Sequence, residues 1–199
     1  MEWIASSRTT HATRNPFLMV DSLAGRLLLA TPSLIDPNFY RSVVLMIEHD
    51  DEGALGVVLN RPMDIPVAEY LEDWEPLAAH PAVVFSGGPV QPEVALAIAR
   101  GPHDETDMSA LIIHDVRLAD LDSDPGGVGY DAIRVFSGYA AWAPEQLEGE
   151  IAEGAWWVFD TSPEDPFVGD AETLWSDVLR RQPGDVAMFA TLPDDPGLN

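Results

Sequence analysis

Cysteine and lysine are both absent from this chain of 199 residues. The lack of cysteine excludes thiol nucleophiles, CxxC redox pairs, thiolate zinc sites and disulfide bridges. The lack of lysine excludes a Walker A phosphate loop, Schiff-base chemistry and Ser-Lys catalysis. No uncharged apolar run approaches the roughly 20 residues of a membrane helix, and the apolar stretch at 17–20 is too short for a signal sequence. We therefore expect a cytoplasmic protein that does not bind membranes.

Positive charge is also scarce. Ten arginines face 34 acidic residues, which gives a net charge of −24 at pH 7. Residues 42–199 carry six of these arginines against 31 acids. Such an acidic body repels nucleic-acid phosphates at long range, and no basic run that could bind them occurs. Direct DNA binding is therefore not expected, and the expected partner is a protein or a small ligand.

The order of predicted elements indicates an α+β fold with a mixed or largely antiparallel sheet. Residues 1–24 lack periodicity, so we predict a flexible arm there and a single domain over 25–199. Apolar and β-branched runs predict strands at 26–31, 42–48, 55–60, 82–85, 94–99, 110–114, 116–120, 132–138 and 156–160. Amphipathic spacing predicts helices at 66–74, 144–152 and 171–181. Pro62 is expected to end the hairpin of 42–60, and consecutive strands favour antiparallel pairing.

Four aspartates recur with a spacing similar to that of a calcium-binding loop. Asp120, Asp122, Asp124 and Asp131 match the carboxylate positions of such a loop. However, Pro125 stands where the loop needs glycine, and the last position is aspartate where a bidentate glutamate is usual. A solvated acidic turn is favoured over metal binding, so we predict no metal site and no cofactor.

His49 is the main candidate for acid–base or metal chemistry. It follows Glu48 and precedes further carboxylates at a predicted hairpin turn, and histidine with carboxylates can ligate a metal or transfer protons. Polar residues at a strand end are the simpler interpretation. Ser86 and Ser137 lack a G-x-S-x-G elbow. We assign no catalytic residue and lean toward a non-enzyme. A metal-assisted hydrolase using His49, Glu48 and nearby carboxylates remains the alternative.

Aromatic residues flank the predicted helix at 144–152. They are Tyr139, Trp142, Trp156 and Trp157. Gln146 and Glu150 share one face of this helix, because they are four residues apart. The aromatic side chains could be core residues with a polar tip. They could also form the floor of a small-ligand cleft, with Gln146, Glu150 and Asn60 as polar contacts.

Several runs of the chain share an order and a spacing. They are GRLLLATPSLIDPNFYRSV at 25–43, the pair Glu48-His49, GALGVVLNRP at 53–62, GGPV at 87–90 and GYAAWAPEQLEGEI at 138–151. Together they resemble the AlgH/YqgE family of small bacterial proteins over residues 25–192. Ala141 stands where the family often has glycine or serine, a harmless departure. The resemblance implies one α+β domain whose bent, bifurcated sheet forms a pseudo-barrel flanked by helices.

The resemblance supplies no settled activity. Some members carry the label of transcriptional regulator through an association with alginate control. The motif positions mark a candidate binding surface made of Asp36, Arg41, Glu48, His49, Asn60, Arg61, Tyr139, Trp142, Gln146 and Glu150. We therefore expect a non-enzymatic binding or regulatory module whose regulation is indirect. An assembly subunit is a further alternative.

Overall fold

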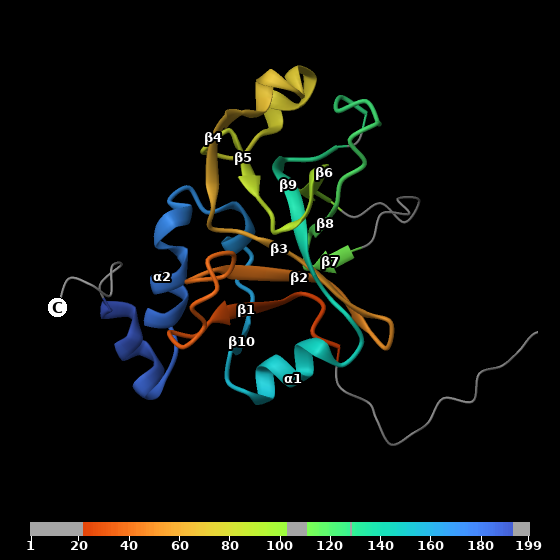
Figure 1. Ribbon diagram of the computed structural model, residues 1–199. Helices are drawn as coiled ribbons and strands as arrows, with labels where there is room; N and C mark the ends of the chain where they lie inside the picture. Colours follow the sequence, from red (N-terminus) through yellow and green to blue (C-terminus); the bar gives the residue numbers. More distant parts are fainter. Residues whose placement is uncertain (1–21, 103–110, 128, 193–199) are drawn as a thin grey trace, which may run out of the picture.

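A computed structural model describes residues 22–102, 111–127 and 129–192 (Figure 1). Most of the predicted N-terminal arm lies outside this range. The strands are β1 (Arg26–Ala30), β2 (Val43–Asp50), β3 (Gly53–Val58), β4 (Pro62–Pro66), β5 (Val83–Ser86), β6 (Val90–Arg100), β7 (Leu111–Ile113), β8 (Val116–Leu118), β9 (Ala132–Trp142) and β10 (Trp156–Asp160). The α-helices are α1 (Gln146–Ala152) and α2 (Leu174–Arg180). The 3-10 helices are η1 (Val67–Glu69), η2 (Glu72–Leu77), η3 (Asp165–Phe167), η4 (Ala171–Thr173) and η5 (Gly184–Thr191).

The strands form a curled sheet in the order β10-β1-β2-β3-β9-β6-β8-β7, and each pairing along this path is antiparallel. Strand β9 divides the sheet, because its residues 140–142 pair with β3 while residues 136–137 pair in parallel with β5. β4 extends this branch by pairing with β5. The result is a half-barrel in one domain (Figure 1). The predicted α+β class and bifurcated sheet are thus confirmed.

Glycines let two backbones cross where β9 changes partners. Gly138 has φ 69° at this point, in the left-handed region that glycine adopts at little cost. A Cβ atom on Gly88 would lie 2.3 Å from the carbonyl carbon of Tyr139, and one on Gly138 would lie 2.8 Å from the Val90 oxygen. The GGPV motif and Gly138 are therefore explained by backbone packing alone.

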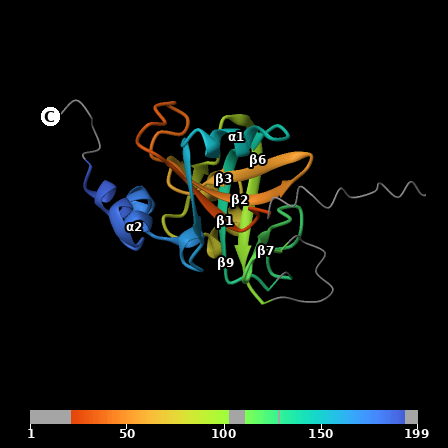
Figure 2. The same ribbon diagram turned by 90° about the horizontal axis from the view of Figure 1, so that it is seen from below.

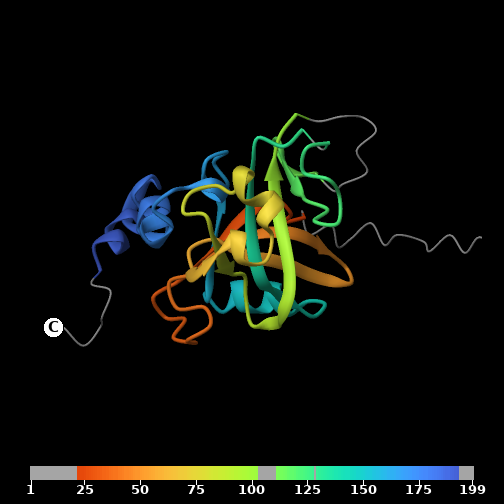
Figure 3. The same cartoon turned by 90° about the horizontal axis from the view of Figure 1, so that it is seen from above.

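Apolar side chains of the sheet pack on both of its faces. In β2, Val43, Leu45 and Ile47 join the core beside α2, whereas Val44 and Met46 join the core beside α1. Figures 2 and 3 show α1 and α2 on different sides of the strands. Because both faces are covered, the strand is a continuous apolar run without polar alternation. None of the helices that the structure describes has the length and hydropathy of a membrane-spanning segment.

The helix predicted at 66–74 is wrong. Two short 3-10 helices, η1 and η2, occupy this region, and Leu71 between them has φ −136° and ψ 59°. Pro76 also lies within η2. Val67 and Trp74 are buried as expected. The apolar spacing at 66–74 therefore reflects which side chains are buried, and it does not require a continuous helix. Pro62 lies after the hairpin and opens β4, which pairs with β5 alone among the described strands and so tolerates proline.

Candidate functional site

The loop between β1 and β2 is shaped by Asp36. Its Oδ1 accepts a hydrogen bond from the Asn38 backbone N–H at 2.7 Å, and its carbonyl oxygen accepts from the N–H groups of Phe39 and Tyr40. These are the contacts of an Asx turn followed by a tight helical turn. Asp36 therefore holds the loop in one conformation, in which Ile35 is 80% exposed.

Asn60 joins this loop to the end of the β3 hairpin. Its Oδ1 accepts from the Val43 backbone N–H at 2.9 Å, and its Nδ2 donates to the Arg41 carbonyl oxygen at 2.9 Å. Arg41 has φ 52°, an uncommon conformation for a residue with a side chain. The amide of Asn60 thus supports a strained residue, and its role is to position Arg41.

Two arginines lie beside the hydrogen bonds of Asn60, which we call the Asn60 brace. The Nη2 of Arg41 donates to the Leu192 carbonyl oxygen at 2.7 Å, and its guanidinium lies 4.7 Å from the centre of the Trp175 ring. The Nη2 of Arg61 donates to the Tyr40 carbonyl oxygen at 3.2 Å. Burial lowers the pKa of Arg61 from its usual value, and the negative charge of Asp36 opposes this shift.

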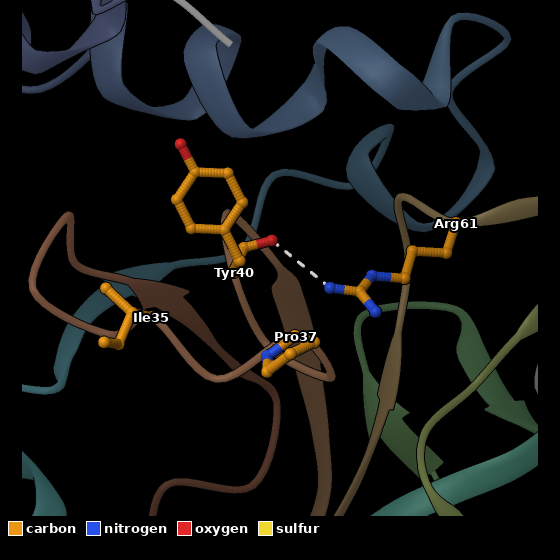
Figure 4. A pocket seen from close by; sticks show the side chains of 4 residues that line it. All are labelled: Ile35, Pro37, Tyr40 and Arg61. Carbon is orange, nitrogen blue, oxygen red and sulfur yellow. Dashed lines mark hydrogen bonds between the residues drawn. The ribbon is translucent and has the colours of Figure 1, made fainter. Parts of the chain in front are cut away.

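A hollow of about 390 Å³ opens beside Arg61 (Figure 4). It is lined by Ile35, Pro37, Tyr40 and Arg61. We call it the loop hollow, and we call the surface formed by residues 35–41 with Asn60 and Arg61 the loop face. The loop face brings together four of the ten predicted surface residues, namely Asp36, Arg41, Asn60 and Arg61. This grouping cannot be seen in the sequence, because Asp36 and Arg41 lie in the β1–β2 loop whereas Asn60 and Arg61 follow β3.

A second group surrounds α1, and we call it the α1 corner. The Oε2 of Glu150 accepts from Nε1 of Trp142 at 3.0 Å and from Nε1 of Trp156 at 2.8 Å. The Nε2 of Gln146 donates to Glu150 Oε1 at 2.9 Å. The Phe39 ring lies 5.4 Å from the Trp156 ring, which links this group to the loop. Here the polar tips of the indoles are satisfied internally, as in a core with a polar handle.

The predicted aromatic set is divided between two sides of the sheet. Trp142 and Trp156 belong to the core beside α1, whereas Tyr139 and Trp157 pack against the core beside α2. Trp157 also lies 5.2 Å from the Phe189 ring of η5. Asn60 makes hydrogen bonds to the backbone of Val43 and Arg41. The structure therefore does not bring these residues together into one cleft.

His49 is a structural connector in the α1 corner. Its Nδ1 accepts from the Leu23 backbone N–H at 3.0 Å, and its Nε2 lies 2.8 Å from Glu148 Oε1. Since Nδ1 must accept, the proton belongs on Nε2, which donates to the carboxylate. The side chain is only 4% exposed. Glu48 is exposed and pairs with Leu55 beyond a bulge. Sequence reasoning missed Glu148, which lies 99 residues from its partner.

Two of the four calcium-loop aspartates, Asp120 and Asp124, make local turns. Asp120 Oδ1 accepts from the Asp122 N–H, and Asp124 Oδ1 accepts from the Gly126 N–H, each at 3.0 Å. Asp131 is exposed at the start of β9. Across residues 22–102, 111–127 and 129–192, no three His, Asp or Glu side chains are placed to hold a metal ion. The solvated-turn interpretation accounts for these contacts.

Every arginine that the structure describes is engaged within the chain. Six donate to backbone carbonyl oxygens, namely Arg26, Arg41, Arg61, Arg100, Arg117 and Arg134. Arg180 and Arg181 donate to the carboxylates of Asp177 and Asp165. Burial also lowers the pKa of Arg134 to about 10. The scarce positive charge is therefore used largely to hold loops on the sheet.

Comparison with known proteins identifies the family. The AlgH-like family model matches residues 27–187. A UPF0301 protein of Streptomyces coelicolor is 51% identical over 187 residues, which covers 90% of this chain and 97% of the relative. A UPF0301 protein of Mycobacterium tuberculosis is 42% identical over 178 residues, which covers 86% and 88%.

Solved structures share the fold. The crystal structure of a Corynebacterium diphtheriae protein has a TM-score of 0.79 and 31% identity, and the match covers 84% of this chain and 91% of that chain. The solution structure of AlgH from Pseudomonas aeruginosa has a TM-score of 0.64 and 27% identity, with coverage of 97% and 100%. The chain therefore belongs to the AlgH-like family.

Proposed function

We propose that this protein is a non-enzymatic binding or regulatory module of the cytoplasm, and that it binds a protein partner or a small ligand through the loop face. The observation that carries the proposal is the loop hollow, to which Arg61 contributes, in a loop whose backbone is held by hydrogen bonds from Asp36 and Asn60. Backbone hydrogen bonds fix this surface before any ligand arrives. Such preorganisation lowers the entropic cost of binding.

The number and arrangement of the arginines support a target other than DNA. Binding to duplex DNA depends on arginine and lysine side chains that neutralise phosphates. The chain has no lysine, and its ten arginines form no basic run that could follow a phosphate backbone. With a net charge of −24 the chain repels phosphates further. A regulatory role would therefore act through a partner and not through direct contact with DNA.

The alternative of a metal-assisted hydrolase gains no support from His49. Both of its ring nitrogens have partners, at 3.0 Å and 2.8 Å, so neither is available to a metal ion or a substrate proton. Glu48 is exposed, whereas His49 is buried. A hydrolase would need a different set of residues.

Site-specific photo-crosslinking in the native host tests the proposal. A benzophenone amino acid at position 35 would report on the loop face, and the same group at Glu172, which is exposed on η4, is the matched control. We expect a discrete adduct at position 35 alone, weakened by Arg61→Met. Equal labelling at both positions would contradict the proposal. So would the absence of any adduct when native mass spectrometry of gently purified protein also shows the bare chain.

A further inference from the structure

We propose that the loop hollow binds a small monocarboxylate with an apolar body, and that Arg61 holds the carboxylate. This inference rests on the proposed function and names the ligand class of the same face. The hollow has a volume of about 390 Å³ and is an open depression lined by four residues, so it suits a small ligand. Figure 4 shows Tyr40 and Arg61 bordering one space, with Ile35 and Pro37 completing its wall.

The wall of the hollow is mainly carbon. Ile35 and Pro37 offer aliphatic groups, and Tyr40 adds an aromatic ring. Ile35 is 80% exposed, although a large aliphatic side chain gains free energy when it leaves water. An apolar ligand body would cover this side chain. The carbon lining thus selects a ligand that is apolar over most of its surface.

Arg61 supplies the polar end of the site. A guanidinium has five N–H donors, and within the described part of the chain Arg61 uses one of them, toward the Tyr40 carbonyl oxygen at 3.2 Å. Burial has removed part of its hydration, which is why its pKa is lowered. A partly desolvated cation with unused donors binds an anion more strongly than an exposed cation does.

The charge of the ligand is limited to one. The planar fork of a guanidinium matches a carboxylate with two parallel hydrogen bonds. Asp36 lies close enough for its negative charge to act on Arg61, and the chain as a whole carries −24. Both oppose a second negative charge on the ligand, so a phosphate ester is disfavoured. A neutral ligand would leave the donors of Arg61 unpaired.

Arg41 cannot take the place of Arg61. Its Nη2 is bound to the Leu192 carbonyl oxygen, and its guanidinium covers the Trp175 ring. Asn60 holds its backbone. Arg41 therefore acts as a positioning residue that keeps the loop against η5 and α2, while Arg61 faces the hollow.

Three probes of equal chain length separate the ligand classes: octanoate, octanol and octyl phosphate. Each is titrated into the full chain, and backbone amide chemical shifts are recorded. We expect saturable shifts at residues 35–41 and 60–62 with octanoate, and weaker binding of the other two probes. Octanol binding as tightly as octanoate, tighter binding of octyl phosphate, or no saturable shift with millimolar octanoate would overturn the proposal.

Two arginine variants test the role of Arg61. Arg61→Met keeps the length of the side chain and removes the charge, and we expect it to weaken octanoate binding about 10- to 100-fold while leaving octanol binding unchanged. Arg180→Met is the matched control, because Arg180 pairs with Asp177 on the surface of α2. It should change octanoate affinity less than about twofold. Equal effects of both variants would overturn the assignment of Arg61.

Failure of the octanoate titration can be distinguished from failure of the photo-crosslinking experiment that tests the proposed function. If octanoate fails while position 35 still crosslinks to a discrete partner, the ligand class is wrong and the loop face remains a binding surface. If both experiments fail, the loop face is not a binding surface and both proposals are wrong. An unfolded variant is recognised from its amide spectrum, and Arg61→Lys then replaces Arg61→Met, with an intermediate loss expected.

Discussion

The α1 corner and the loop face use polar residues in opposite ways. In the α1 corner, the carboxylates of Glu148 and Glu150 are bound to buried donors, the imidazole of His49 and two indoles. At the loop face, hydrogen bonds fix the backbone, and among residues 22–102, 111–127 and 129–192 the side chain of Arg61 makes one hydrogen bond beside an open hollow. The difference separates residues that hold the fold from the residues that we propose to bind a ligand. Substitutions can test this division, in order of decreasing expected loss of stability.

Glu150→Ala should cause the largest loss of stability. It removes the shared acceptor of the Trp142 and Trp156 indoles, which are 5% and 3% exposed as residues. Two buried N–H groups left without a partner should lower the free energy of unfolding by about 2–4 kcal/mol. Urea unfolding measures the loss. Glu153→Ala, at the exposed end of α1, is the control and should stay within about 0.5 kcal/mol. Similar losses in both variants would contradict a structural role for Glu150.

His49→Ala should cost less, about 1–3 kcal/mol, because it removes two hydrogen bonds of a buried ring. The Leu23 amide should also lose its protection against hydrogen exchange. Glu48→Ala is the neighbouring control, since Glu48 is exposed. If His49→Ala left both stability and Leu23 exchange unchanged, His49 would not be a connector, and the hydrolase alternative would have to be considered again.

Asn60→Ala tests the brace beneath the loop face. It leaves the Val43 N–H and the Arg41 carbonyl without their side-chain partner, and a loss of about 1–2 kcal/mol is expected. Because Arg41 has a left-handed backbone, the substitution should also change the amide shifts of the loop. Unchanged shifts at 35–41 would show that the loop face does not depend on this amide.

Arg61→Met should affect stability least. Among the described residues its side chain makes one hydrogen bond, to a backbone oxygen, and its charge is partly desolvated. Loss of the hydrogen bond destabilises the fold, whereas removal of the partly buried charge stabilises it. These two effects nearly cancel, so a change within about 0.5 kcal/mol is expected. The division between the two regions would be sharpest if this variant kept the stability of the wild type and lost octanoate binding. A loss of stability as large as that of Glu150→Ala would place Arg61 among the structural residues.

Local pattern predicted most strands, because their residues are apolar on both faces or strongly β-branched. The run at 156–160 matches β10 residue for residue. The predicted helix at 66–74 failed because its apolar spacing is also met by two 3-10 turns around Leu71. The sequence did not predict β4, because its two prolines suggest a loop. A strand forms there because β4 lies at an edge, where proline is tolerated.

The candidate site could be predicted only as a set of residues. The motif runs included Asp36, Arg41, Asn60 and Arg61, but also His49 and Glu150, whose side chains are hydrogen-bonded within the α1 corner. Nothing in the local sequence distinguishes the residues of the loop face from those of the α1 corner. The distinction depends on partners that lie far away in the chain, such as Glu148 for His49.

The sequence by itself determined the chemistry that is excluded and the sign of the field around the molecule. The absence of cysteine and lysine and a net charge of −24 follow from composition alone. Only the tertiary structure decided what the few arginines do. A guanidinium is free or engaged according to the carbonyls that the fold brings to it, as with Arg134 and the oxygen of His80, 54 residues away. That is why the position of Arg61 beside an open hollow could be found only in the folded chain.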